Sequence, residues 1–506
     1  MTTVETTSGQ LRGVQETGYL AFRGIPFARP PVGPLRFRPP QPPEPWSGAR
    51  DATRFAGAAP QTKADLGRFM AGFGVGEQSE DCLTLNVATP ATDGAGRPVL
   101  FWIHGGAFTI GAGSQRMYDP GPLVLRGDVV VVTTNYRLGA LGFLHLDTLG
   151  GPEFGATSNA ALLDQIAALQ WVRENVAGFG GDPDNVTIFG ESAGGFSVGT
   201  LLGTPGAQGL FRRAIAQSGA AHRVNSAEQA TEVAVELLEE LSLSPGDAGR
   251  LRELPAEVIV EAQLRLTRRW ERGGWRRAFC PVVDGRVLPE HPLDAIRAGL
   301  SREVSVMAGA TRDEWKLFGL MDPQAAKLDD QQLLARVEKR APGHGQRLVD
   351  AYRAARAGDD PRPSTPPELF FAFETDRVFR MPVIRLLEAQ HVHQAQTYGY
   401  LMTWESPLAG GSLGACHGID VPFVFGNVGK KGAEAFAGSG PEAEQLRDRI
   451  MDAWLGFARS GDPSHPDLGA WPPYDEERRA TMILDAECVV EEDPLSAERR
   501  AWDGVL

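Results

Sequence analysis

Val186–Gly195 reads VTIFGESAGG, a short apolar run followed by a serine set among glycines. Within it, Gly190–Gly194 matches the pattern G-x-S-x-G. A serine at a sharp strand-to-helix turn needs glycine on both sides, because the backbone bends tightly and the helix lies close to the strand. Such a turn exposes the hydroxyl and places backbone N–H groups of the helix beside it. The segment predicts that Ser192 is a nucleophile.

The pattern alone is weak evidence for a nucleophilic serine, because 60 of the 506 residues are glycine and chance matches to it occur. Gly410–Gly414 fits it equally well around Ser412. Ser412, however, stands in Gly-rich sequence after Pro407, with no strand-like run immediately before it. We therefore interpret Ser412 as a loop serine.

Short apolar runs and helical spacing alternate along the chain, which predicts the fold class. Asn159–Val176 has apolar residues at helical spacing and is expected to form a helix. The runs expected to form strands are Val99–Ile103, Val129–Val132, Val186–Phe189, Val304–Ala308 and Tyr398–Trp404. Continuous rather than alternating apolarity is typical of strands covered by helices on both faces. We expect an α/β fold with a mostly parallel central sheet, helices on both faces and large insertions.

Composition limits the classes of function. Of the residues, 42% are hydrophobic and 23% charged, and the net charge is −14, which disfavours binding to nucleic acid. The N-terminus lacks the pattern of a signal peptide, and no apolar run is long enough to span a membrane. Four cysteines without a CxxC pair suit a reducing compartment. We expect a cytoplasmic protein in which residues 1–506 form a single domain, without a membrane partner.

An activated serine requires a base, an acid that orients the base, and donors for the oxyanion. His417 follows the strand-like Tyr398–Trp404 in a turn, the usual place for the base in this type of fold; the other histidines after Ser192 lie in charged or Gly-rich segments. Asp313 and Glu314 both follow a strand, and spacing does not choose between them as the acid. His104–Ala107 (HGGA) follows another strand and predicts an oxyanion loop.

Together these motifs resemble type-B carboxylesterases, the α/β-hydrolase family that includes bacterial para-nitrobenzyl esterases and the cholinesterases. The resemblance runs nearly end to end. It rests on Phe22–Phe37, Ser79–Asn86, Trp102–Phe108, Asn135–Phe143, Leu162–Val172, Phe179–Gly195, Ala214–Gly219, Pro281–Gly285 and His417–Phe425. It implies a serine carboxylesterase that hydrolyses small-molecule esters with no metal or organic cofactor.

The resemblance also implies roles for single residues. It selects Glu314 rather than Asp313 as the acid, with Ser192 and His417 as the other two members of a catalytic triad. The remaining implied roles are the oxyanion donors Gly106, Ala107 and Ala193, a supporting serine at Ser218, and a structural ion pair between Arg36 and Glu80. The implied substrate pocket contains Leu317 and Phe318, with Trp275 and Arg277 nearer the acyl side.

The chain departs from the family pattern in two places. Trp315 replaces the usual glycine after the acid, which affects the turn there. Cys82 is the first cysteine of the chain, so the disulfide that secreted relatives form with an upstream cysteine is not expected. Two alternatives stay open: a hydrolase of other specificity (thioesterase, amidase or lipase) and a non-catalytic interaction protein on the same fold. Whether the protein is a monomer or a homodimer also stays open.

Overall fold

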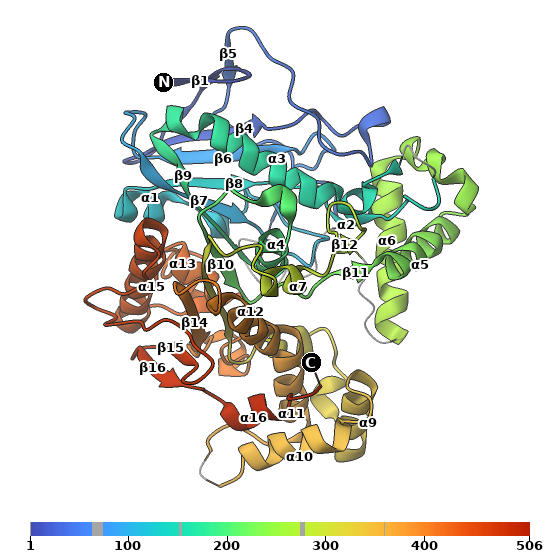
Figure 1. Cartoon of the computed structure of the whole chain (residues 1–506), viewed down its shortest axis with the longest axis vertical. Helices are drawn as coiled ribbons and strands as arrows, with labels where there is room; N and C mark the ends of the chain where they lie inside the picture. The colour runs from blue at the N-terminus through green and yellow to red at the C-terminus, as the bar shows by residue number, and fades with distance from the viewer. Residues whose placement is uncertain (1, 63–73, 151–153, 274–278, 359, 506) are drawn as a thin grey trace.

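The structure is a computed structural model that describes residues 2–62, 74–150, 154–273, 279–358 and 360–505. Within this part, eleven strands form one sheet (Figure 1). They span Val14–Gln15 (β3), Leu20–Pro26 (β4), Thr84–Thr89 (β6), Arg97–Ile103 (β7), Val130–Thr134 (β8), Gly181–Glu191 (β9), Arg213–Gln217 (β10), Ser305–Thr311 (β13), Thr397–Met402 (β14), Ala480–Leu484 (β15) and Val489–Glu492 (β16).

The strand order across the sheet is β16-β15-β14-β13-β10-β9-β7-β8-β6-β4-β3. All pairs from β15 to β8 are parallel, and the pairs outside them are antiparallel. The parallel centre confirms the expected sheet, with antiparallel strands at both edges. The carboxyl ends of the parallel strands lie along one edge, where loops after different strands can meet.

Strand β7 shows why a continuous apolar run indicates a central strand in this sheet. Its residues Val99, Phe101 and Ile103 enter one hydrophobic core, whereas Leu100 and Trp102 enter a second core on the opposite face. A strand with both faces buried gains no advantage from alternating polar residues.

Helices cover both faces, as expected. One face carries α3 (Ala160–Asn175), α4 (Ala193–Leu202) and α12 (Met381–His391). The other carries α1 (Gly121–Gly127) and α15 (Pro441–Ser460). The helix expected over Asn159–Val176 corresponds to α3, and the helix expected after Ser192 corresponds to α4.

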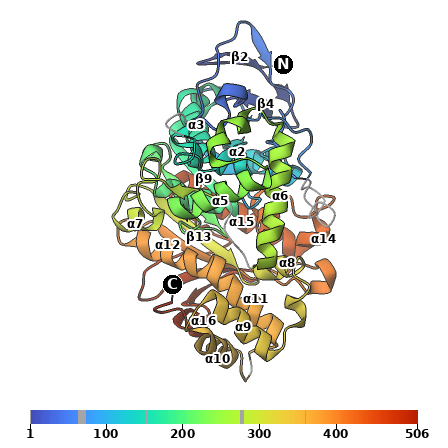
Figure 2. The same cartoon turned by 90° about the vertical axis from the view of Figure 1, so that its right-hand side faces the viewer.

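The insertions form additional helical layers. Helices α5 (Ala227–Glu240) and α6 (Ala256–Gly273) contact each other beside the sheet. Helices α9 (Asp330–Arg340), α10 (Gly345–Ala355) and α11 (Pro366–Thr375) share a separate small core. Figure 2 shows these three helices at the end of the molecule away from the N-terminus. None of the helices in the described ranges is long and apolar enough to cross a membrane.

The Arg36–Glu80 ion pair is confirmed. The Arg36 guanidinium donates to Glu80 Oε1 at 2.7 Å and to Glu80 Oε2 at 2.5 Å. It also donates to the carbonyl oxygens of Leu251 at 2.9 Å and Leu254 at 2.6 Å. The buried arginine thereby ties the N-terminal segment to the segment before α6.

Candidate active site

Ser192 occupies the tight turn between β9 and α4. Its backbone has φ +57° and ψ −122°, a conformation that non-glycine residues rarely adopt. A Cβ atom on Gly194 would lie 1.9 Å from the Ile103 carbonyl oxygen, and one on Gly190 would lie 2.6 Å from Gly194. The glycines flanking Ser192 are therefore required by packing, and the strain at Ser192 is imposed by the turn.

His417 and Glu314 come from two loops at the carboxyl edge of the sheet. Glu314 follows β13, and His417 lies between β14 and α13 (Val421–Val424). The Nδ1 atom of His417 lies 2.5 Å from Oε2 of Glu314. The other oxygen, Oε1, accepts the Thr311 N–H at 2.8 Å. Glu314 is completely buried, so both oxygens are fixed and the imidazole is held by one of them.

A second carboxylate lies on the other side of the imidazole. Oε1 of Glu191 is 3.1 Å from Nε2 of His417. Glu191 is buried and directly precedes Ser192 in the turn. Nε2 therefore lies at the turn that carries the serine, although among the described residues the Ser192 hydroxyl has no hydrogen-bond partner, His417 included.

Burial and this arrangement of charges change the protonation of the site. Burial raises the pKa of Glu191 to about 8. Burial opposes the charged form of His417, but the carboxylates of Glu191 and Glu314 outweigh it and raise the pKa of His417 to about 9. Burial also raises the pKa of Asp420 to about 6. Perturbed pKa values of this kind gather at functional sites.

The HGGA loop lies against the serine turn. A Cβ atom on Gly105 would lie 3.2 Å from Cβ of Ser192. Gly106 has φ +113° and Ala107 has φ +53°, and in the part of the chain that the structure describes neither N–H donates a hydrogen bond. Ala193 begins α4, so its N–H has no acceptor within the helix. The three predicted oxyanion donors thus lie on the two segments that meet at Ser192.

Aromatic packing holds this loop in place. The ring of His104 stacks on Tyr136 with centroids 4.5 Å apart, and the Tyr136 hydroxyl donates to the His104 carbonyl oxygen at 2.8 Å. Burial lowers the pKa of His104 to about 4, which keeps its ring neutral. His104 therefore supports the loop and is a poor candidate for a base.

Two aromatic rings lie against His417. The Phe379 ring lies 4.8 Å and the Phe318 ring 5.0 Å from the imidazole, centroid to centroid. Phe196 stacks on Phe379 at 6.1 Å, and Trp315 lies 4.9 Å from Phe318. These side chains form an aromatic cluster beside His417, and Phe318 is the member of it that we expect in the substrate pocket.

The sequence did not indicate Glu191, Phe196 or Phe379. Glu191 occupies the first x of the G-x-S-x-G motif, where any residue is allowed, so the motif does not indicate a function for it. Phe379 lies in a π-helical turn, Asp376–Arg380, between α11 and α12. Such turns are frequent at functional sites, but they leave no clear pattern in a sequence.

The structure places the remaining predicted residues in different environments. Ser218 donates its N–H to the Gly309 carbonyl oxygen at 2.8 Å, but its buried hydroxyl has no hydrogen-bond partner among the described residues. Leu317 is buried in the core on the side of α15. Trp275 and Arg277 lie outside the described residues. Ser412, the competing serine, is exposed after a 3₁₀ turn, Leu408–Gly411.

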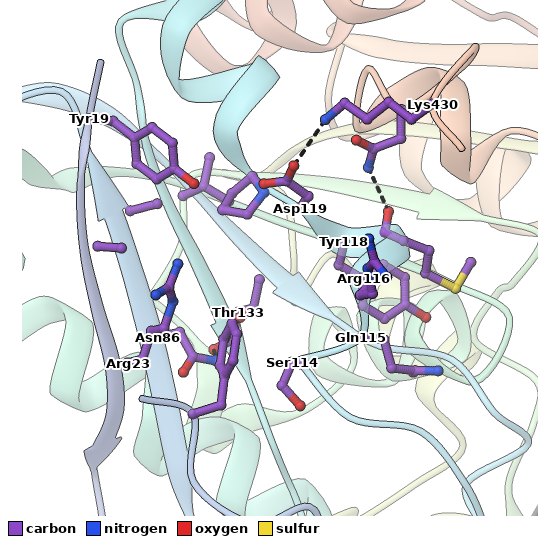
Figure 3. Close-up of a pocket in the computed structure, with 18 of the residues that line it drawn as sticks. Tyr19, Arg23, Asn86, Ser114, Gln115, Arg116, Tyr118, Asp119, Thr133 and Lys430 are labelled. Carbon is purple, nitrogen blue, oxygen red and sulfur yellow. Dashed lines mark hydrogen bonds and ion pairs between the residues drawn. The ribbon is translucent and has the colours of Figure 1, made fainter. Parts of the chain in front are cut away.

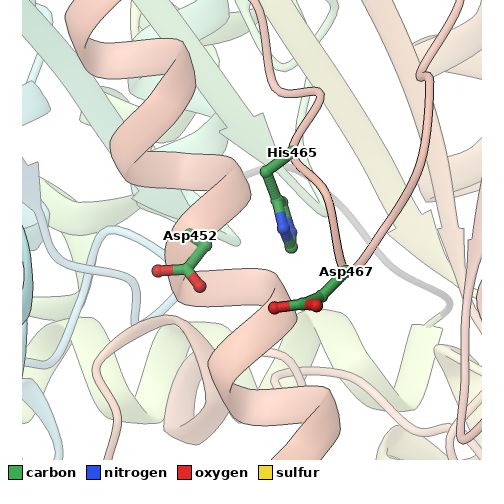
Figure 4. Close-up of side chains that lie close together, drawn as sticks. All are labelled: Asp452, His465 and Asp467. Atoms are coloured by element: carbon green, nitrogen blue, oxygen red, sulfur yellow. The ribbon is translucent and has the colours of Figure 1, made fainter.

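Within the described ranges, one group of side chains has the composition of a metal-binding site. It consists of Asp452, His465 and Asp467, which lie close together in Figure 4. Arg126 already binds both oxygens of Asp452, at 2.7 and 2.8 Å. A guanidinium at that distance repels a cation. We therefore interpret the group as part of a surface ion-pair network.

Comparison with known proteins assigns the chain to a family. The model of the carboxylesterase family matches residues 1–502. The chain belongs to the carboxylesterase family. Among relatives of this carboxylesterase, para-nitrobenzyl esterase of Bacillus subtilis is 39% identical, over 98% of this chain and 97% of its own length. Phenmedipham hydrolase of Pseudarthrobacter oxydans is 36% identical, over 95% and 94%.

Solved structures are similar over the whole chain. Carboxylesterase EST55 of Geobacillus stearothermophilus superposes with a TM-score of 0.89 at 42% identity, covering 99% of this carboxylesterase and all of that chain. A thermophilic para-nitrobenzyl esterase superposes with a TM-score of 0.87 at 38% identity, covering 99% of each. The fold is therefore the α/β-hydrolase fold, and the chain is a carboxylic ester hydrolase.

Proposed function

We propose that this carboxylesterase hydrolyses small-molecule carboxylic esters through an acyl-enzyme on Ser192. The observation that supports it best is the position of His417, whose Nδ1 contacts Glu314 and whose Nε2 lies at the serine turn. An imidazole fixed on one nitrogen by a carboxylate can accept a proton on the other.

In the first half-reaction, Oγ of Ser192 attacks the ester carbonyl while its proton moves to Nε2 of His417. Glu314 stabilises the imidazolium that forms. The N–H groups of Gly106, Ala107 and Ala193 donate to the oxyanion of the tetrahedral intermediate. The C–O bond to the alcohol then breaks, and His417 returns the proton to the leaving alkoxide.

In the second half-reaction, water attacks the acyl-enzyme while His417 removes its proton. The acid leaves, and His417 returns the proton to Ser192. Ser218, which is buried directly after β10 and donates its N–H to Gly309 of β13, is proposed to support the triad by packing. No step requires a metal or an organic cofactor.

His417 acts as a base only when its imidazole is neutral. With Glu191 beside Nε2, a proton is shared between the two groups: the ionised carboxylate favours imidazolium, and the protonated carboxyl favours neutral imidazole. We therefore propose that Glu191 sets the pH range in which the triad is active.

The substrate pocket is proposed to be lined by Leu317, Phe318 and Phe379, with Trp275 and Arg277 nearer the acyl side, as the family resemblance implies. An arginine on the acyl side would favour esters that carry an acid group. Arg277→Ala should then lower kcat/KM for an acid-bearing ester relative to its neutral counterpart, and an unchanged ratio would remove this part of the proposal.

A screen of matched substrates tests the proposed specificity. A para-nitrophenyl ester series, the corresponding thioester and the para-nitroanilide should be compared, with Ser192→Ala as the control. We expect the short esters to be the fastest by kcat/KM, with no turnover by the variant. Faster thioester or anilide hydrolysis, or a preference for long acyl chains, would favour a thioesterase, amidase or lipase. No hydrolysis by a folded wild-type protein would favour an interaction protein.

We also propose that the enzyme is cytoplasmic and works as one domain. Cys82, Cys416 and Cys488 are thiols, which suits a reducing compartment. The family match over residues 1–502 supports a single unit.

A further inference from the structure

A cavity of about 320 Å³ lies against the sheet where β4, β6 and β8 are neighbours (Figure 3). Ala21, Ala88 and Val131, one from each of these strands, contribute to its apolar lining. Tyr19 and Tyr118 line it as well. Ser192, Glu191 and His417 are not part of its lining. Its volume is sufficient for a small organic molecule.

The charged groups that line the cavity are mostly positive. They are the cations Arg23, Arg116, Lys430 and Lys431 and the carboxylate of Asp119. This contrasts with the whole chain, whose net charge is −14. A local excess of cations on an acidic protein indicates attraction for an anion at this place.

Two of the cations are already compensated. Arg23 forms an ion pair with Glu16 at 2.5 Å, and Lys430 forms one with Asp119 at 2.9 Å, as Figure 3 shows for the second pair. Arg116 and Lys431, both exposed, form no ion pair within the described ranges. Two positive charges at the cavity are therefore available to a ligand.

From these features we propose that the cavity binds a small organic carboxylate. The apolar lining would cover a hydrocarbon body, and Arg116 and Lys431 would bind the carboxylate at the solvent side. An inorganic anion would make no contact with the apolar lining, and a neutral hydrocarbon would make no ion pair with Arg116 or Lys431. A ligand with both a hydrocarbon body and a carboxylate contacts both parts of the cavity. The proposal does not depend on ester hydrolysis, because it uses none of the catalytic residues.

Calorimetric titration of the full chain with 1-naphthoate tests the proposal, with 1-naphthamide as the uncharged counterpart and inorganic sulfate as the purely ionic one. We expect saturable binding of one naphthoate, and binding of the amide and of sulfate at least about tenfold weaker. Naphthamide binding as tight as naphthoate would overturn the role of the cations, and tighter sulfate binding would overturn the role of the apolar lining.

Variants locate the binding. The double variant Arg116→Glu/Lys431→Glu should weaken naphthoate binding about tenfold or more. The control Arg286→Glu/Lys327→Glu makes the same charge change at exposed cations that do not line the cavity, and it should leave binding unchanged. Ser114→Trp, a lining position, should also block binding by filling the cavity. Binding that persists in both cavity variants, or that is lost equally in the control, would contradict the proposed site.

Discussion

Nε2 of His417 lies 3.1 Å from Oε1 of Glu191, while Nδ1 of the same ring lies 2.5 Å from Oε2 of Glu314. The imidazole is thus placed between two buried carboxylates. Glu314 is the partner that fixes the orientation of the ring, whereas Glu191 lies on the side from which the serine proton arrives in the proposed mechanism. The carboxylates of Glu191 and Glu314 both raise the pKa of His417, and Glu191 is the one that lies beside Nε2.

Replacing Glu191 tests this directly. Glu191→Gln removes a negative charge that raises the pKa of His417, so that pKa should fall. Because the base is active in its neutral form, the acid limb of the profile of kcat/KM against pH should move to lower pH. The measurement is that profile for a para-nitrophenyl ester. Glu442→Gln, an exposed carboxylate on α15, should leave it unchanged; an unshifted limb in Glu191→Gln would show that Glu191 does not set the pKa of His417.

The proposed oxyanion loop should be sensitive to a single added methyl group. A Cβ atom on Gly106 would lie 2.1 Å from the Ile110 carbonyl oxygen, so Gly106→Ala must displace the loop. We expect kcat to fall roughly 10²–10³-fold, the usual effect of losing one oxyanion donor. Gly94→Ala is the matched control, since Gly94 also has a positive φ but nothing within 4 Å of its Cβ position. Full activity of Gly106→Ala would argue against this loop as the oxyanion site.

Phe379 should affect substrate choice more than chemistry. Its ring contacts the imidazole from a π-helical turn that a buried Asp376–Arg380 ion pair holds together. Phe379→Ala should raise KM for a benzoate ester roughly 2–10-fold, the range expected for one lost aromatic contact, and should affect an acetate ester less. Comparing the two esters within the same variant supplies the control. Equal effects on both esters would indicate that Phe379 positions His417 instead of contacting the acyl group.

The Arg36–Glu80 pair should contribute to stability and not to catalysis. Glu80→Ala leaves the Arg36 guanidinium buried without its carboxylate, which costs about 3–5 kcal/mol of the free energy of unfolding. Arg38→Ala, two residues from Arg36 and exposed, should change it by less than about 0.5 kcal/mol. Denaturant unfolding monitored by fluorescence measures both, and similar values for the two variants would contradict a structural role for the pair.

The fold could be predicted from the sequence because its central strands are buried on both faces and read as continuous apolar runs, as β7 does. The positions of Ser192, Glu314 and His417 could be predicted because each follows such a strand, although only the family resemblance chose Glu314 over Asp313. Glu191 could not be given a role, since its effect depends on a distance to His417 across the sheet edge. Phe379 could not be found either, because a π-helical turn brings it to the imidazole from a helical insertion.

The two G-x-S-x-G serines allow the central claim to be tested within one chain. The enzyme should be treated with a phosphonate ester that reacts with activated serines, and the labelled peptide identified by mass spectrometry. The account predicts one label on Ser192, which is absent in Ser192→Ala and in His417→Ala and retained in Ser412→Ala. A label on Ser412, or full labelling of folded Ser192→Ala, would contradict it.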